Sequence, residues 1–340
     1  MASGEQSPLV SVVLPVFNGA ALAGQAIESA LAQTDCSLEV IAIDDGSTDD
    51  SLEMLRRYGD RIRVLEQPNL GVGAARAAGV RAARGEYVAF LDQDDWWLPG
   101  KLARQVAALR GDDRLGLAHT EVRYFDEARQ QFTGPLNPDA RPERLTGDCY
   151  GELLLENHVR NSSVLTRASV LRAVGFDTGI AGNSVQDYEL WLKVARVSRF
   201  AYLDEPLTVI RLHPDQGTWD RRRMLGDEAE LLERIAADVE RTPVFRERMA
   251  RLYDSLGVAH LDVADLRSAR PCFRRSLGWR PTLRAGVLYL LTCCPRFVLQ
   301  GIRSWRGRGA KPSQGASQPV MVGEDSLAGT ALRPPASTIT

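Results

Sequence analysis

The chain has 340 residues, of which 44% are hydrophobic and 25% are charged, and its formal net charge is −2. This composition is typical of a soluble globular protein. The five cysteines include no C-x-x-C pair, and their odd number argues against a disulfide framework. The apolar run at 286–294 is far too short to span a bilayer. Because the first ten residues also lack a signal pattern, we expect a reduced, cytoplasmic protein.

Strands and helices are predicted to alternate along the first part of the chain. Apolar runs at 10–17, 38–43, 61–65 and 87–91 have the length and composition of buried parallel strands. The Ala-rich stretch at 71–83 is predicted to be a helix. Short links between these elements predict an α/β fold, with a mostly parallel sheet and helices on both faces.

Acidic residues follow two of these strands, at the same predicted edge of the sheet: Asp44 and Asp45 after the second strand, and Asp92, Asp94 and Asp95 after the fourth. Open α/β sheets bind ligands at this edge. In extended backbone Asp92 and Asp94 would share a face, and a hard cation held with phosphate oxygens would relieve their repulsion. The pattern predicts a nucleotide bound with a metal, and no P-loop is present. Alternatively, the acids form a solvated turn in which Asp95 caps the next helix.

Further elements follow in the second half of this region. Short strands are predicted at 115–119 and 207–213. The polar stretch at 126–145 is predicted to be a surface excursion.

In combination, the segments 11–18, 40–49, 69–76 and 85–95 resemble the family-2 glycosyltransferases, and the resemblance extends over roughly residues 8–215. It implies a GT-A fold, a nucleotide-diphospho-sugar donor (most commonly a UDP-sugar) and Mn²⁺ or Mg²⁺. It also implies an acceptor that is a saccharide or a lipid-linked molecule.

The resemblance implies roles for particular residues. Those expected to bind the nucleotide-sugar are Pro15, Asp45, Arg76, Asp92 and Arg211, with Asp45 reading the nucleobase. Those expected to hold the metal are Asp94, Asp92 and His213. Ala77 stands where the family often has Asn, and His213 alone could also be a structural histidine.

A helix predicted at 185–194 carries Asp187 in its opening turn. The helix dipole lowers the pKa of such an acid unless burial or other acids oppose it. The resemblance implies that Asp187 is the general base, although Gln186 replaces the usual Glu, and a simple capping acid is the alternative. Glu189 should face away from Asp187 on the helix.

The chain is expected to divide into a catalytic domain at 8–217, a helical region at 218–308 and a disordered tail at 309–340. From 266 onward there are twelve basic and two acidic residues, a net of +10 against −12 for the rest. The basic, apolar-interleaved segment at 266–311 could rest on an anionic membrane surface, or pack with a solvated basic face. Because apolar residues are interleaved with the arginines of this segment, the pattern argues against nucleic acid as its partner.

We therefore expect a metal-dependent, inverting glycosyltransferase that moves a sugar to an acceptor hydroxyl in surface polysaccharide or glycoconjugate assembly. It would be cytoplasmic, either free or peripheral on the inner face of the cell membrane. The alternative is a non-catalytic sugar-nucleotide-binding or scaffold protein on the same fold. A nucleotidyltransferase would need a basic triphosphate site, and the catalytic half is acidic.

Overall fold

The structure of the protein is a computed structural model that describes residues 10–34, 36–133, 145–176, 184–213, 220–237 and 241–293. Its strands are β1 (Val10–Val16), β2 (Leu38–Asp44), β3 (Arg63–Glu66), β4 (Tyr87–Phe90), β5 (Trp96–Trp97), β6 (Leu115–Asp126), β7 (Gln131–Thr133), β8 (Val164–Arg167) and β9 (Arg199–Leu212). Its helices are α1 (Ala23–Leu31), α2 (Ser51–Arg56), α3 (Val72–Ala82), α4 (Lys101–Gly111), α6 (Tyr150–Leu155), α7 (Ala168–Val174), α8 (Gln186–Ala195), α9 (Arg221–Ile235), α10 (Pro243–Asp262), α11 (Leu266–Trp279) and α12 (Leu283–Cys293). Short 3₁₀ turns lie at η1 (Gly59–Arg61) and η2 (Asn161–Ser163).

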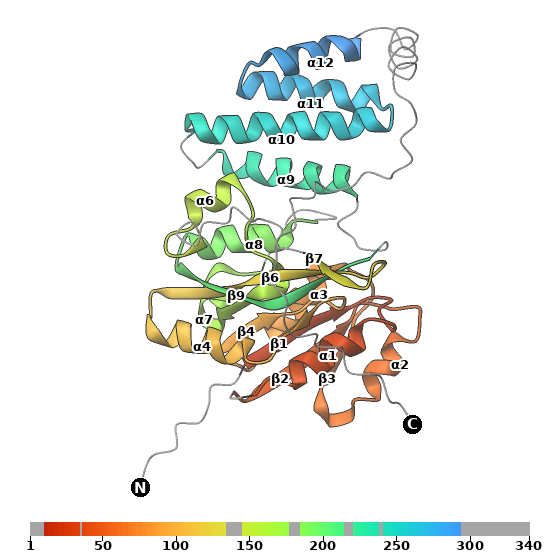
Figure 1. Cartoon of the computed structure of the whole chain (residues 1–340), viewed down its shortest axis with the longest axis vertical. Coiled ribbons are helices and arrows are strands. Elements are labelled where there is room, and N and C mark those ends of the chain that lie inside the picture. The colour runs from red at the N-terminus through yellow and green to blue at the C-terminus, as the bar shows by residue number, and fades with distance from the viewer. Residues whose placement is uncertain are drawn as a thin grey trace. The chain divides into compact units, whose positions relative to one another are not determined.

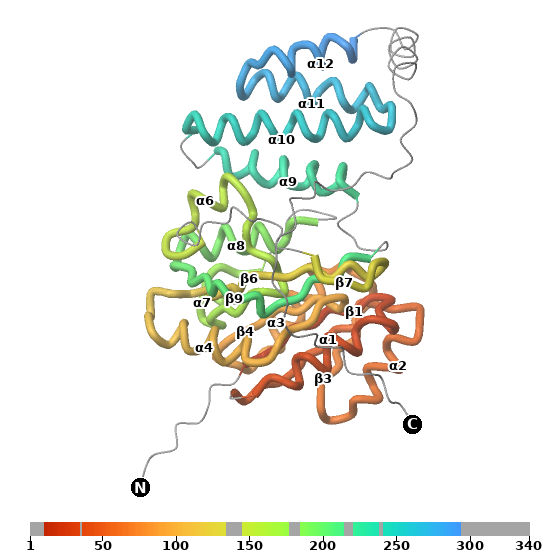
Figure 2. Tube along the Cα trace, viewed as in Figure 1, coloured from red at the N-terminus to blue at the C-terminus, as the bar shows by residue number. Residues whose placement is uncertain are grey.

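The strands form one sheet in the order β3-β2-β1-β4-β8-β6-β9-β5, with β7 paired to β6 (Figure 1). The first four strands run parallel, since β1 pairs with β2 and β4, and β2 pairs with β3. Beyond β4 the sheet is mixed: β8 is antiparallel to β4 and β6, while β6 and β9 run parallel, side by side (Figure 2). The predicted α/β fold is confirmed, and its parallel part is the half that carries the acidic clusters.

Strands β6 and β9 are longer than the short strands predicted at 115–119 and 207–213. They pair along the whole of β6, and the register shifts between Leu115 and Leu117 and on both sides of Glu121. Such bulges bend a strand without ending it. The prediction ended β6 too early and began β9 too late. The polar residues outside the predicted ranges are held in strand conformation by pairing with a strand that is distant in the chain.

Alternate residues of the parallel strands face two different cores, because successive side chains of a strand point to opposite faces. Leu14 of β1 lies in the core that includes residues of α1 and α4, whereas Val13 lies in the core that includes residues of α3 and α8. Helix α3 approaches the sheet closely: a Cβ on Gly79 would lie 2.5 Å from Cγ1 of Val13. The Gly/Ala-rich composition of α3 therefore lets its backbone lie directly against β1.

The C-terminal helices pack against the sheet-covering helix α8. Trp191 of α8, Leu232 of α9 and Met249 of α10 are fully buried in one hydrophobic cluster. Helix α11 packs on α10, where a Cβ on Gly257 would lie 2.7 Å from the ring of Phe273. The predicted helical region therefore shares its core with the first part of the chain.

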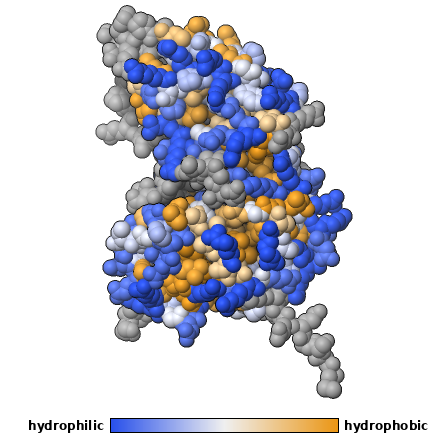
Figure 3. Space-filling view, turned by 180° about the vertical axis from the view of Figure 1, so that it is seen from behind, coloured by the Kyte–Doolittle hydropathy of each residue, from blue (hydrophilic) through white to orange (hydrophobic). Residues whose placement is uncertain are grey.

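Helix α12 exposes apolar side chains among hydrophilic ones. Leu283 is 87% exposed and Val287 is 47% exposed, and the space-filling view shows both kinds of residue on the surface (Figure 3). No helix in the described ranges is long and apolar enough to cross a membrane. The predicted tail at 309–340, the basic segment beyond Cys293 and residues 134–144 of the predicted excursion lie outside the described residues.

Candidate active site

The candidate site lies where the parallel strands β1, β2 and β4 end. Because these strands are in parallel register, their carboxyl ends lie along one edge of the sheet. Asp45 follows β2 and the turn Asp92–Asp95 follows β4 at this edge. The charges of Asp92, Asp94 and Asp187 act together on the buried Arg76 of α3. The structure thus brings together acids from β4 and α8 that the sequence separates widely.

Asp92 is held by three residues. Its Oδ1 accepts a hydrogen bond from Nη2 of Arg76 at 2.5 Å and from Nδ2 of Asn161 at 2.9 Å. Its backbone N–H donates to Oγ of Ser162 at 3.1 Å. The Asp92 carboxylate is therefore fixed by the protein itself, and 29% of its side chain remains exposed.

Arg76 is the internal counter-ion of the acidic site. Burial opposes its positive charge, but the charges of Asp92, Asp187 and Asp94 outweigh burial and raise the pKa of Arg76. From the sequence, we expected a bound cation to relieve the repulsion between the carboxylates, and we expected Arg76 to bind the nucleotide-sugar. In the structure Arg76 supplies part of that relief before any ligand binds.

Asp94 and His213 lie together, as the resemblance implied. Nε2 of His213 is 3.1 Å from Oδ2 of Asp94. Burial and the charge of Asp92 raise the pKa of the Asp94 carboxyl. The extended backbone expected between Asp92 and Asp94 is wrong, because Asp95 N–H donates to the Asp92 carbonyl at 3.1 Å and closes a turn. The tight turn, rather than strand alternation, brings the two carboxylates close.

The residues present fit a divalent cation that is held jointly with phosphate. Asp94 offers a carboxylate oxygen and His213 an imidazole nitrogen, a donor pair that suits Mn²⁺ or Mg²⁺ only when further oxygens complete the coordination. In the described part of the chain, no three His, Cys, Asp or Glu side chains form a group that could hold a metal by themselves. The raised pKa of Asp94 reflects a site in which added positive charge would be stabilising.

Asp95 is a buried structural acid, and the alternative in which it caps the next helix is wrong. The residue that precedes α4 is Gly100. Asp95 instead accepts hydrogen bonds from Oγ of Ser162 at 2.5 Å and from the backbone N–H of Arg211 at 3.2 Å. Burial and the charges of the two neighbouring acids raise its pKa well above the usual range. It joins the turn after β4 to η2 and β9.

Arg211 supports the turn that carries Asp94. Its Nε donates to the Asp94 carbonyl at 3.1 Å, its Nη1 to Oε1 of Glu127 at 3.1 Å, and its Nη2 to Oε1 of Gln25. Its guanidinium also lies over the ring of Trp96, 5.0 Å from the centroid. These donors are directed at protein acceptors, so a contact of Arg211 with the diphosphate stays a prediction.

Asp45 is buried and fixed by the loop that leads into α3. Its Oδ1 accepts from Nε2 of Gln67 at 2.7 Å and from the Leu70 N–H at 2.9 Å, and its Oδ2 accepts from the Gly71 N–H at 2.9 Å. A carboxylate offers about four acceptor positions, so one remains for a nucleobase N–H. Pro15 is buried in β1 beyond the last pairing with β4, where its missing N–H breaks no hydrogen bond to that strand.

Asp187 lies in the first turn of α8, partly buried. Its Oδ1 accepts from the Tyr188 N–H at 2.8 Å. Burial raises the pKa of Asp187, and the positive charge of Arg76 opposes that shift. Glu189 is engaged elsewhere, in ion pairs with Lys193 at 3.2 Å and Arg234 at 3.5 Å. The expectation that Glu189 faces away is therefore confirmed, and burial overrides the helix dipole at Asp187.

Sequence reasoning missed the polar residues of η2. Asn161 and Ser162 bind Asp92 and Asp95, as described above, and Ser162 also accepts the indole N–H of Trp97 through its carbonyl at 2.7 Å. A polar Asn-Ser-Ser run directly before an apolar strand was the available signal.

The chain is similar to known glycosyltransferases. A family model described as glycosyl transferase family 2 matches residues 11–161. The chain is 32% identical over 220 residues to an uncharacterized glycosyltransferase of Rickettsia typhi, covering 64% of this chain and 68% of that protein. A corresponding protein of Rickettsia prowazekii is 32% identical over 214 residues, 62% of this chain and 66% of that one. Chondroitin synthase of Escherichia coli is 32% identical over 208 residues, 60% of this chain but only 29% of that protein.

Solved structures share the fold at low sequence identity. Residues 1–349 of Staphylococcus aureus TarS, solved in complex with UDP-GlcNAc, match with a TM-score of 0.56 and 17% identity, covering 83% of this chain and 79% of that one. The mannosyltransferase PcManGT from Pyrobaculum calidifontis, solved with GDP-Man and Mn²⁺, matches with a TM-score of 0.54 and 19% identity, covering 89% and 84%.

Proposed function

Because the chain belongs to glycosyl transferase family 2, we propose that it transfers a sugar from a nucleoside-diphosphate-sugar to an acceptor hydroxyl, with a divalent cation and with inversion. The proposal is carried by the convergence of Asp94 and Asp187 on the buried Arg76, together with the contact of His213 with Asp94. The similarity to chondroitin synthase supports a role in polysaccharide or glycoconjugate assembly. The fold shared with proteins that bind UDP-GlcNAc and GDP-Man supports the class of donor.

On the donor side, Asp94 and His213 would hold Mn²⁺ or Mg²⁺ together with the donor diphosphate. When bound, the cation would stabilise the negative charge that grows on the leaving nucleoside diphosphate. Asp92 would stay on Arg76 and keep the turn in place. Asp45, oriented by three hydrogen bonds, would accept a base N–H, which both uracil and guanine offer.

On the acceptor side, Asp187 would take the proton of the attacking hydroxyl. Its raised pKa moves it toward the range in which a general base works best near neutral pH. Its carboxylate accepts only the Tyr188 N–H among the described side-chain and backbone donors, so capacity remains for the acceptor hydroxyl. A single displacement assisted by this base would invert the anomeric carbon.

The donor half of this proposal is tested by isothermal titration of UDP and GDP, with and without Mn²⁺. We expect Mn²⁺-dependent binding of at least one nucleotide to the native protein. Asp94→Ala should abolish the Mn²⁺ dependence, whereas Asp60→Ala, which removes an exposed acid elsewhere, should leave it unchanged. Equal, still metal-dependent affinity in Asp94→Ala would remove Asp94 from the metal site.

We also propose that the enzyme is cytoplasmic and attaches peripherally to anionic membranes through 266–311. The exposed Leu283 and Val287 of α12, and the absence of acids from 266 to 323, support this location. Liposome flotation tests it: binding to anionic vesicles should weaken with salt and be lost when Leu283 and Val287 are both replaced by Asp. The same change at the exposed Val197 and Val244 is the matched control. Equal flotation of both variants would exclude the α12 surface.

A further inference from the structure

Gln93, the residue between Asp92 and Asp94, binds the chain just beyond the end of β1. Its Oε1 accepts a hydrogen bond from the Phe17 N–H at 2.9 Å, and its Nε2 donates to the Phe17 carbonyl at 3.1 Å. One side-chain amide therefore engages both backbone groups of a residue that lies 76 positions earlier in the chain. The roles proposed above for the nucleotide-sugar and the metal do not involve Gln93.

These two hydrogen bonds follow the point at which the main-chain pairing of β1 with β4 ends. The Leu91 N–H still donates to the Val13 carbonyl at 3.1 Å, so alternate residues of β1 direct their backbone groups to β4. Pro15 is the next residue directed to that side, and it has no N–H with which to continue the ladder. Phe17 comes after it, and its backbone groups meet the Gln93 side chain in place of a backbone.

The loop after β1 leaves space for this side chain. Gly19 is buried, and its φ lies outside the left-handed region that favours glycine. The three atoms nearest to a Cβ on Gly19 would all belong to Gln93, with its Cδ at 2.7 Å. Glycine is therefore required at this position for space and not for backbone conformation. The chain thus accommodates the Gln93 amide at a defined place.

The same loop is joined to the segment that follows β2. The Asn18 N–H donates to Oγ of Ser47 at 3.0 Å, and the Thr48 N–H donates to Oδ1 of Asn18 at 2.8 Å. Asp45 lies in this segment, directly after β2. Gln93 therefore links the turn that carries Asp94 to the loops around Asp45, the two residues that the proposed function assigns to the cation and the nucleobase.

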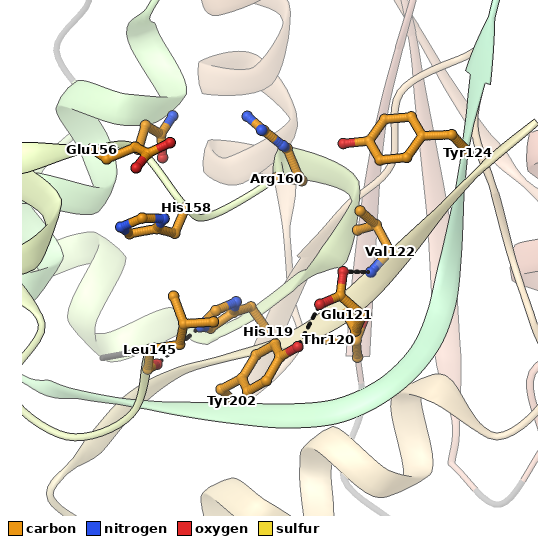
Figure 4. A pocket seen from close by; sticks show the side chains of 11 residues that line it. His119, Thr120, Glu121, Val122, Tyr124, Leu145, Glu156, His158, Arg160 and Tyr202 are labelled. Atoms are coloured by element: carbon orange, nitrogen blue, oxygen red, sulfur yellow. Dashed lines mark hydrogen bonds between the residues drawn. The ribbon is translucent and has the colours of Figure 1, made fainter. Parts of the chain in front are cut away.

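On its other side the turn is held by η2, where Asn161 and Ser162 bind Asp92. Residues of the segment 156–160 that leads into η2 line a cavity of about 300 Å³ together with residues of β6 (Figure 4). Strand β1, in contrast, is buried at every residue from Val10 to Val16. Because close-packed interiors transmit displacements, the bonds of Gln93 tie the turn to the stiffer of these two supports.

We propose that Gln93 is a positioning residue that couples the cation to the nucleotide, because it fixes the turn that carries Asp94 to the loop at 17–19. The inference rests on the proposed function and adds the residue that joins the two halves of the donor site. Coupling between two ligands is reciprocal. Loss of the Gln93 hydrogen bonds should therefore lower the gain in nucleotide affinity that Mn²⁺ provides.

Isothermal titration of UDP and GDP, with and without Mn²⁺, tests this coupling in the full chain. Gln93→Met keeps the length of the side chain and removes both hydrogen bonds. We expect the Mn²⁺-dependent gain in affinity to fall about fivefold, the scale of one neutral hydrogen bond, while the affinity without Mn²⁺ changes less. A merely structural role would lower both affinities alike and leave the gain unchanged.

Gln33→Met is the matched control. The Gln33 amide also binds two backbone groups, since it donates to the Leu98 carbonyl at 3.0 Å and accepts from the Leu102 N–H at 3.2 Å. This variant should keep the native Mn²⁺-dependent gain.

Gly19→Ala tests the same contact from the other side. The added methyl group should displace the Gln93 amide and reproduce the loss of the gain, but it should cause no further loss in Gln93→Ala, which lacks the clashing atoms. An unchanged gain in Gln93→Met, an equal loss in Gln33→Met, or additive losses from Gly19→Ala and Gln93→Ala would each overturn the inference. These results leave the donor half of the proposed function standing, whereas native protein without any Mn²⁺-dependent nucleotide binding would overturn both.

Discussion

The role of Arg76 as internal counter-ion predicts a large effect of Arg76→Met, which keeps the aliphatic stem and removes the charge. The substitution leaves Asp92, Asp94 and Asp187 without their shared positive partner. Removing one member of a buried ion pair typically costs about 3–5 kcal/mol of unfolding free energy. Because the Asp92 side chain is 29% exposed and keeps its bond from Asn161, we expect about 2–4 kcal/mol.

The destabilisation should depend on pH. Burial raises the pKa of Asp187, so this carboxyl binds a proton more readily in the folded than in the unfolded chain, and stability falls as pH rises through the raised pKa. Arg76 holds that pKa down. Its removal raises the pKa further, and the loss of stability from Arg76→Met should therefore be smaller at pH 5 than at pH 8.

Urea unfolding followed by tryptophan fluorescence at the two pH values measures this effect. Arg61→Met, which breaks an ion pair exposed on both sides, should unfold like the native protein. Adding Asp92→Asn to Arg76→Met should recover part of the stability, because it removes one of the stranded charges. A loss below about 1 kcal/mol, or one that is equal at both pH values and unchanged by Asp92→Asn, would refute the counter-ion role.

Three further changes follow from the structure. Asp187→Asn should keep Mn²⁺-dependent nucleotide binding but lower sugar transfer about 10²-fold or more in a coupled nucleotide-release assay. Near-native turnover of this variant would show that Asp187 is not the general base. Lys101→Met should raise the urea midpoint of unfolding, and more at pH 6 than at pH 10. Burial lowers the pKa of Lys101, so the unfolded chain binds the proton more readily than the folded one. A lower midpoint in the variant would contradict this. Gly79→Ala should destabilise by about 1–2 kcal/mol in urea, since the clash with Val13 and Ile43 exceeds the gain in helix propensity.

Much of the fold was predictable from local pattern. Apolar runs that end in acids identify β2 and β4, and the Ala-rich stretch identifies α3, because strand and helix periodicity are properties of neighbouring residues. The continuation of β6 and β9 was not predictable in this way. Their polar residues become strand only through pairing with each other, and that pairing joins positions far apart in the chain.

The candidate site was likewise only partly predictable from the sequence. Residue type and motif placed Asp94, His213 and Asp187 in the candidate site, and the structure brings Asp94 and His213 into contact. The partners of Arg76 and Arg211 could not be read from the sequence, because a guanidinium binds whichever acceptors the fold presents. Tertiary packing directs Arg76 to the acids and Arg211 to protein acceptors around Asp94.

The central claim is sugar transfer by a single displacement at the carboxyl edge of the sheet. The most direct test is proton NMR of the reaction with UDP-N-acetylglucosamine and with GDP-mannose, each in the presence of Mg²⁺. It shows which anomer of the free sugar appears first when water accepts the sugar. Both donors are α-linked, so the account predicts that the β anomer forms first and that Asp187→Asn slows its appearance. First formation of the α anomer, or no consumption of either donor by the native protein, would contradict it.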